Sequence, residues 1–223
     1  MFHPLLTSMS ALKDADIESK ISEIELYCNF LTKYLPTKNF TWAFLDSQSN
    51  GVIKGFGTLV CDVNQMLEKY NQLCSQYLSE TKYPELVAYP TVHVTLNQTN
   101  DKGRKNSDIE AARVFCVDLY YEISEETLRE IINSTLPEMV VQSSPNKYHL
   151  YWHCNPSILL DDWKQVQTAL AGYFGADLNL SSLCKTIRVP GFSRMTKQGQ
   201  LFMPSIVYLE TQEQGQEQGR RIS

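Results

Sequence analysis

Val114-Phe115-Cys116-Val117-Asp118-Leu119-Tyr120 places one carboxylate in a run that is otherwise apolar or aromatic. The run is rich in β-forming residues, so we expect a strand with Asp118 and Tyr120 on one face and the intervening apolar residues on the other. A carboxylate in such a strand costs free energy unless water, a charged partner or a metal ion satisfies it. The strand therefore indicates either a functional face of a sheet or a face that is merely solvated.

The segments after this strand predict an alternation of helices and strands. Ser124 is placed to cap a helix that runs to Asn133. Further strands are expected at 139–142, 148–153 and 205–209, and a helix at 162–174 closed by Gly175. With the first strand, this gives the order β-α-β-β-α-β, which is the split βαβ arrangement. In that arrangement we expect the first and third strands side by side at the centre, with both helices on one face.

His149 and Tyr151 lie on the third of these strands, on the face opposite to its apolar residues. A lone sheet histidine is more often satisfied by its neighbours than used as a ligand. The topology nevertheless makes Asp118 and His149 neighbours on an exposed sheet surface, and this adjacency favours a functional site.

The first ninety residues predict a separate lobe. Apolar residues at helical spacing favour helices at 14–35 and 63–79, and strands are expected at 40–45 and 51–60. A further strand, at 92–97, is expected after this lobe. The fold class we expect is α/β (α+β), a compact unit that combines an N-terminal α/β lobe at 1–90 with a split βαβ palm, RRM-like or ferredoxin-like, at 91–209. The tail at 210–223 is rich in Gln, Glu and Gly and is expected to be disordered.

The formal net charge of −5 excludes binding of nucleic acid through the field of the whole molecule, so any polyanion contact must be local. Two segments of the chain are locally basic. The stretch 185–197 contains no acid, and Lys102-Gly103-Arg104-Lys105 forms a smaller basic loop. The basic residues of the longer stretch are Lys185, Arg188, Arg194 and Lys197.

No apolar run approaches the roughly 18 to 20 residues that cross a bilayer, and the N-terminus lacks the pattern of an export signal. We therefore expect a soluble cytoplasmic protein without membrane contacts. The six cysteines include no Cys-x-x-Cys pair, so packed thiols are expected rather than structural zinc. His153, Cys154 and Cys184 form the trio considered for zinc, and burial in the core is their expected role.

Several short segments, in this order, resemble the archaeo-eukaryotic primase (primase-polymerase) superfamily and especially its RepB-like plasmid and phage branch. The resemblance covers residues 91–197. Its lead-in is 92–99 with Gly103-Arg104 and Asp108-Ile109, and its three motifs are 114–120, 144–152, and 175–177 followed by 188–192.

The resemblance implies a DNA primase/polymerase that performs template-directed nucleotidyl transfer on single-stranded DNA for a plasmid, phage or other mobile element. It also implies NTP or dNTP substrates, a replicative helicase as a partner, and Mg²⁺ or Mn²⁺ as the cofactor. By the same resemblance, Asp118 and Asp177 are metal ligands and, with His149, catalytic residues. The residues implied to bind nucleotide or template phosphates are Lys147, His149, Lys185 and Arg188.

Two departures from the family pattern stand out. Tyr120 occupies the position of the second acid in the first motif, and an uncharged phenol is a poor metal ligand. Glu122 is the nearest substitute, but it lies about 13 Å from Asp118 along an extended strand. Ser182 stands where relatives often have an acid, and Lys185 where they usually have Arg.

These departures leave two alternatives to an active primase. One is a catalytically impaired relative that binds nucleotide or single-stranded nucleic acid, with Tyr120, His149 and Tyr151 available for stacking on bases. The other is a scaffold or interaction lobe whose polar face is solvated.

Overall fold

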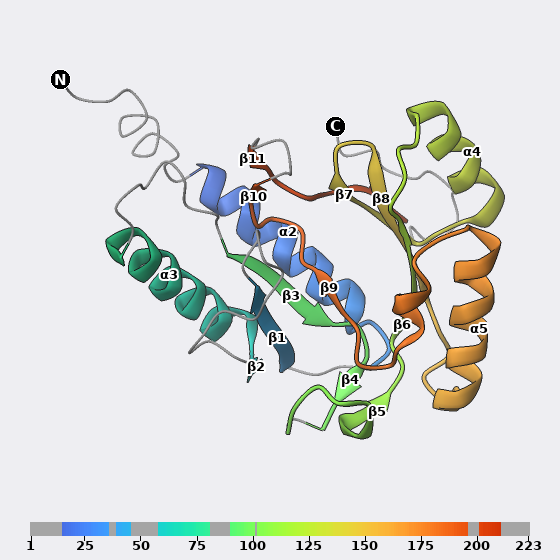
Figure 1. The fold of residues 1–223 in the computed structure, drawn as a ribbon, viewed down its shortest axis with the longest axis horizontal. Helices are drawn as coiled ribbons and strands as arrows, with labels where there is room; N and C mark the ends of the chain where they lie inside the picture. Colours follow the sequence, from blue (N-terminus) through green and yellow to red (C-terminus); the bar gives the residue numbers. More distant parts are fainter. Residues whose placement is uncertain are drawn as a thin grey trace.

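The computed structural model describes residues 15–35, 39–45, 58–80, 90–100, 102–195 and 201–210. Its described residues form two four-stranded antiparallel sheets and four α-helices (Figure 1). Side chains from both sheets meet in one buried core, which includes Trp42, Val94, Val114 and Tyr151. The two sheets therefore share an interior. None of the described helices is long and apolar enough to cross a bilayer.

The first sheet has the strand order β2-β1-β3-β9. Helix α3 (Val63–Glu80) packs on β1 and β2, and both this helix and the strand at 40–45 confirm the sequence predictions. Of the strand predicted at 51–60, residues 51–57 lie outside the described residues. The strands are β2 (Thr58–Cys61), β1 (Phe40–Leu45), β3 (Thr91–Thr95) and β9 (Thr186–Arg188).

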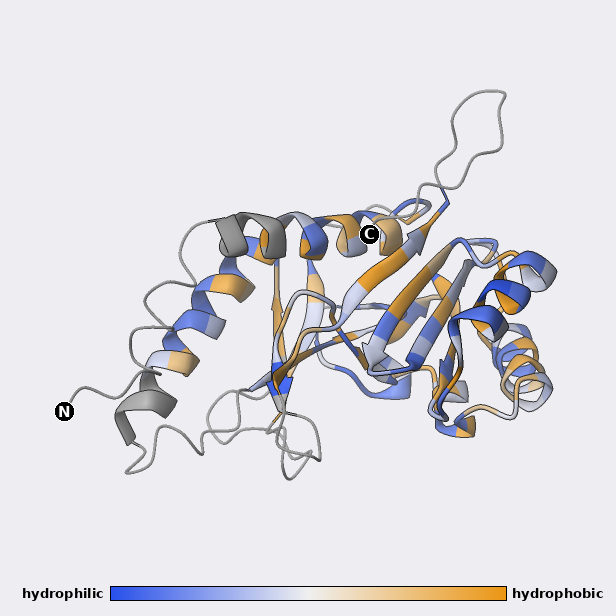
Figure 2. Cartoon of the chain, turned by 90° about the horizontal axis from the view of Figure 1, so that it is seen from above, coloured by the Kyte–Doolittle hydropathy of each residue, from blue (hydrophilic) through white to orange (hydrophobic). Residues whose placement is uncertain are grey.

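The second sheet has the order β12-β7-β8-β6, and helices α4 (Glu125–Thr135) and α5 (Leu160–Tyr173) cover its outer face (Figure 1). Ser124 caps α4 by accepting the Thr127 backbone N–H, and Gly175 adopts φ 59 after α5, as expected. One of the two apolar faces of this sheet packs against the helices, whose outer sides are mostly hydrophilic (Figure 2). The strands are β12 (Ser205–Leu209), β7 (Met139–Ser144), β8 (Lys147–His153) and β6 (Val114–Leu119).

The order of this sheet corrects one prediction. β6 pairs with β8 as expected, but β12 pairs with β7, so β7 and β8 are central and β6 is an edge strand. After α5 the chain first crosses to the other sheet to form β9. It then forms the hairpin of β10 (Arg194–Met195) and β11 (Leu201–Phe202) before it returns beside β7. This detour separates the last strand from β6.

Helix α5 covers the exposed edge of β6. Gln167 accepts the backbone N–H of Cys116 at 3.0 Å and donates its amide to the carbonyl of the same residue. Trp163 donates its indole N–H to the carbonyl of Val114 at 3.0 Å. An unpaired edge invites association with another strand, and these buried side chains satisfy it within the chain.

The second correction concerns the face of this sheet opposite α4 and α5, which is not open. Helix α2 (Ala15–Leu31) lies across it, with Tyr27 and Phe30 in edge contact with the Tyr151 ring. Tyr151 is fully buried and therefore not available for stacking on bases. The apolar stripe of α2 was predicted, but the sequence does not show which surface the stripe covers.

Residues 91–209 contribute strands to both sheets, because β3 and β9 complete the sheet begun by β1 and β2. The boundary at residue 90 stays a prediction, and residues 211–223 of the predicted tail lie outside the described residues. A short hairpin that was not predicted, β4 (Gln98–Thr99) with β5 (Ile109–Ala111), extends from the end of β3 and carries the basic loop.

Candidate functional site

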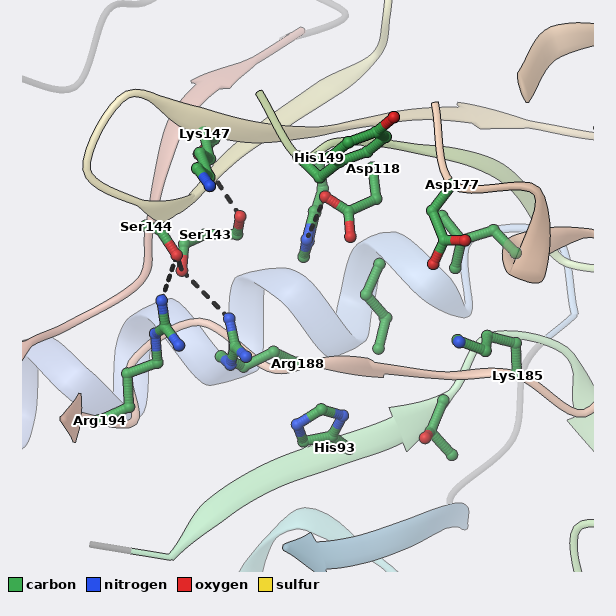
Figure 3. Close-up of a pocket in the computed structure, with 14 residues that line it drawn as sticks. His93, Asp118, Ser143, Ser144, Lys147, His149, Asp177, Lys185, Arg188 and Arg194 are labelled. Atoms are coloured by element: carbon green, nitrogen blue, oxygen red, sulfur yellow. Dashed lines mark hydrogen bonds and ion pairs between the residues drawn. The ribbon is translucent and has the colours of Figure 1, made fainter. Parts of the chain in front are cut away.

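The six residues singled out from the sequence line one pocket, at the uncovered end of the second sheet and opposite β9 (Figure 3). The volume of the pocket is about 360 Å³. These side chains come from β6, from β8, from the loop after α5, and from β9 with the residue that precedes it. They are Asp118, Lys147, His149, Asp177, Lys185 and Arg188.

Asp118 and His149 are directly paired across β6 and β8, as the sequence predicted. Nε2 of His149 lies 3.6 Å from Oδ1 of Asp118. Burial, and then the charges of Arg188 and Arg194, lower the pKa of His149 to about 3. The imidazole is therefore neutral at pH 7, and this contact is a polar contact rather than an ion pair. The predicted exposed surface is also wrong for His149, which is buried.

Asp118 is half-buried, and its environment pushes its pKa in two directions. Burial raises the pKa of its carboxyl above the ordinary value, Arg188 lowers it, and the charge of Asp177 raises it. The two carboxylates therefore interact electrostatically although they come from distant parts of the chain. A cation between the two carboxylates would relieve their mutual repulsion.

Asp177 is held by the segment that follows α5. Gly175 takes the left-handed conformation that ends the helix, and Asp177 then caps a short 3₁₀ helix. Oδ1 of Asp177 accepts the backbone N–H of Asn179 at 2.9 Å and the side-chain amide of Asn179 at 2.8 Å. These bonds fix the orientation of the carboxylate. They would also account for Asp177 as a purely structural helix cap.

Two arginines form the basic wall of the pocket (Figure 3). Arg188 donates from Nη1 to the carbonyl of Ser143 at 3.2 Å, and Arg194 donates to Oγ of Ser144. Burial, and then repulsion from Arg194, lower the pKa of Arg188 to about 10. The buried Nε atoms of these two arginines have no hydrogen-bond partner among the described residues. Both guanidinium groups belong to the pocket lining, where their charge favours a bound anion.

Lys147 reaches the pocket as the first residue of β8, directly after the turn in which Asn146 adopts a left-handed φ of 57. The pocket therefore brings four cationic side chains, from Lys147, Lys185, Arg188 and Arg194, against two carboxylates. This excess of positive charge in a partly buried site suits a polyanionic group such as a triphosphate.

His93, Ser143, Ser144 and Arg194 also line the pocket; of these, Arg194 was expected only as part of the basic stretch 185–197 and Ser144 only as part of the motif 144–152. His93 lies opposite Arg188 in the β3–β9 pairing. Burial, and then the charge of Arg188, lower the pKa of His93 to about 3. The position of His93 between Val92 and Val94 indicated a polar side chain in an apolar strand. The partner strand β9 could not be identified from the sequence.

A divalent cation fits this site only in part. The described residues contain no group of three or more His, Cys, Asp and Glu side chains that could hold a metal ion. Asp118 and Asp177 offer hard oxygen ligands of the kind that Mg²⁺ and Mn²⁺ prefer, and water or phosphate would complete the coordination. Tyr120 borders the pocket with 54% exposure and adds no carboxylate, while the exposed Glu122 is absent from the lining.

Comparison with known proteins gives a consistent result. The sequence model of the RepB DNA-primase N-terminal domain matches residues 92–216. A search among curated proteins found no match. Three solved structures superpose on this chain. Because their sequence identities are low, the likeness shows a shared fold alone.

The AEP domain of the cyanophage S-2L primase-polymerase superposes with a TM-score of 0.60 at 12% identity, over 83% of this chain and 88% of that chain. Primase RepB' gives a TM-score of 0.55 at 15% identity, over 84% of this chain and 55% of that chain. The catalytic domain of primase RepB' in complex with initiator DNA gives 0.52 at 16% identity, over 81% and 84%.

Proposed function

This chain belongs to the family of the RepB DNA-primase N-terminal domain, and from that premise we propose that it catalyses template-directed nucleotidyl transfer on single-stranded DNA. The substrates are NTPs or dNTPs. The setting is the replication of a plasmid, phage or other mobile element in the cytoplasm, with a replicative helicase as partner. The observation that carries the proposal is the convergence of two carboxylates and four cationic side chains on one pocket.

The basic wall binds the triphosphate of the incoming nucleotide. Arg188 and Arg194 repel one another, and a polyanion between them relieves that repulsion. Lys147, the first residue of β8, adds a further positive charge. His149 is neutral, so it can donate a hydrogen bond to the phosphates and adds no charge of its own. These groups also stabilise the pyrophosphate that leaves when the new phosphodiester bond forms.

The acidic wall, Asp118 and Asp177, holds a divalent cation, Mg²⁺ or Mn²⁺. When bound, such a cation supplies charge for the triphosphate and lowers the pKa of the primer 3′-hydroxyl. The task of the chain is to present two oriented carboxylates. Asn179 orients Asp177, and the charge of Arg188 lowers the pKa of Asp118 in opposition to burial, which raises it more.

A second candidate function is nucleotide or single-stranded DNA binding without catalysis. The observation that favours it is Tyr120, which stands beside the pocket in place of an acid. In this alternative the basic wall still binds phosphates, but the site does not align a primer for attack.

An incorporation assay separates the two functions. Purified protein, labelled nucleotides, a polypyrimidine template and Mn²⁺ should give template-dependent products, and Asp118→Asn or Asp177→Asn should abolish them. Asp161→Asn removes an exposed carboxylate of α5 that does not line the pocket, so it should retain activity. Template-dependent synthesis that survives in both pocket variants contradicts the proposed function. Nucleotide binding without any synthesis by the wild-type protein supports the second candidate instead.

A further inference from the structure

The loop at the tip of the β4–β5 hairpin carries three cations, Lys102, Arg104 and Lys105. We call residues 102–105 the basic loop. It borders a hollow of about 650 Å³, which Asp108 and Cys184 also line. This hollow is larger than the candidate active-site pocket and is distinct from it, since the two share no lining residue.

The basic loop has a defined shape. The backbone N–H of Lys102 donates to Oδ1 of Asn100 at 3.1 Å, and the backbone N–H of Lys105 donates to Oδ2 of Asp108 at 2.8 Å. A Cβ atom at Gly103 would lie 2.9 Å from the same Oδ2, so the turn closes tightly on this carboxylate. Asp108 therefore serves the backbone of the loop instead of pairing with its lysines.

The charges of the basic loop remain available for a ligand. Lys102 and Lys105 are exposed, and Arg104 is half-buried. The ion pairs found among the described residues all lie elsewhere in the chain. Three cations thus lie within four residues, although Asp101 and Asp108 flank them, on a molecule whose formal net charge is −5.

Asn106 ties the basic loop to the candidate active site. Its Oδ1 accepts the backbone N–H of Cys184 at 3.2 Å and the hydroxyl of Ser182 at 3.4 Å. The next residue of that segment, Lys185, lines the active-site pocket. The charges of Arg104 and Lys185 both contribute to the lowered pKa of His93, a residue of the pocket, after the larger effects of burial and Arg188.

We propose that the basic loop binds the sugar-phosphate backbone of the single-stranded DNA template beside the active site. The inference rests on the proposed function and adds a template-binding surface to it. A polymer with regularly spaced phosphates can engage both the loop and Lys185, whereas a small anion would engage one of them. Because the overall charge repels DNA, binding requires such a local set of cations.

A salt titration of DNA binding tests the proposal. A labelled oligothymidylate is titrated with wild-type protein, without nucleotide or metal, between about 50 and 200 mM salt. The variant Lys102→Gln/Lys105→Gln removes the two exposed loop charges. The matched control Lys69→Gln/Arg129→Gln removes the same net charge from exposed positions on α3 and α4. Thermal melting of each variant verifies that it folds.

The loop variant should bind more weakly, and the slope of log affinity against log salt should fall by about 1.4, at about 0.7 per lost phosphate contact. The control should keep the wild-type slope, and triphosphate binding should be unchanged in the loop variant. The proposal is overturned if loop and control variants have equal slopes, or if the loop variant loses triphosphate rather than DNA affinity. Because this assay involves no synthesis, its failure is distinguishable from failure of the incorporation assay, which tests the proposed function.

Discussion

The hydroxyl of Tyr151 lies 3.3 Å from Nδ1 of His149, on the same face of β8. Tyr27 of α2 donates its own hydroxyl proton to Tyr151 at 3.2 Å. Tyr151 is then free to donate to Nδ1, which leaves the proton of the neutral imidazole on Nε2, toward Asp118. A helix that contributes no residue to the pocket thereby contacts the hydroxyl group that faces a histidine inside it.

Tyr151→Phe is expected to weaken triphosphate binding by about three- to tenfold, the effect of losing one hydrogen bond. Without the tyrosine hydroxyl, the imidazole can place its proton on either nitrogen, and the Nε2 donor is no longer assured. Fluorescence titration with a non-hydrolysable nucleotide measures this effect. Tyr148→Phe is the matched control, because Tyr148 lies on the same strand with its ring on the opposite face. Equal affinities for the Tyr151 variant and the wild type would show that the Tyr151 hydroxyl does not control the proton position of His149.

Acidification should destabilise the fold as the pH falls from 6.5 to 3. His149 and His93 have their pKa values lowered from 6.5 to about 3, first by burial and then by Arg188. In this range the unfolded chain binds protons that the folded chain excludes, so the free energy of unfolding falls. Each histidine contributes about 1.4 kcal/mol per pH unit. Asp118, whose pKa is raised, acts in the opposite direction.

Urea unfolding of wild-type protein and His149→Gln across this pH range measures the effect. The variant should lose stability with a shallower slope, by about one proton. The same comparison in an Asp118→Asn background removes the opposing contribution. Parallel pH profiles for the two proteins would show that His149 is not buried in its neutral form.

Glu138→Gln should lower the free energy of unfolding by about 1.5 to 3 kcal/mol, the range for hydrogen bonds to charged groups. His153 joins Glu138 at 2.7 Å to the carbonyl of Phe30 in α2, also at 2.7 Å. Burial alone would raise the pKa of Glu138, but the hydrogen bonds from His153 hold it at about 2.

This contribution of Glu138 is present above its ordinary pKa of 4.5 and is lost as the pH falls toward 2. Urea unfolding at neutral pH measures its size. Glu125→Gln is the control, because Glu125 forms an exposed pair with Arg129 that is worth under about 0.5 kcal/mol. A cost for Glu138→Gln no larger than that of the control would show that this contact does not hold α2 on the sheet.

Strand periodicity and element order were enough to predict that Asp118 and His149 are neighbours on the second sheet. Alternation placed Asp118 and His149 on one face, and the β-α-β-β-α-β order placed their strands side by side, both of which the structure confirms. These signals are local. The two-residue periodicity of a strand and the order of neighbouring helices and strands can both be identified from short stretches of sequence.

The parts that could not be predicted depend on contacts between distant segments. The pairing of β3 with β9 brings His93 against Arg188, and no local pattern identifies strands so far apart in the chain as partners. The same crossing moves β12 beside β7. The docking of α2 buries Tyr151, which alternation alone had assigned to an open face.

The central claim is that Asp118 and Asp177 bind one divalent cation together, and titration of Mn²⁺ followed by electron paramagnetic resonance tests it most directly. The signal of free Mn²⁺ should decrease on addition of wild-type protein and triphosphate, and Asp161→Asn should behave in the same way. Asp118→Asn and Asp177→Asn should each leave the free signal at its value with triphosphate alone. Undiminished Mn²⁺ binding in either single variant would contradict the shared site.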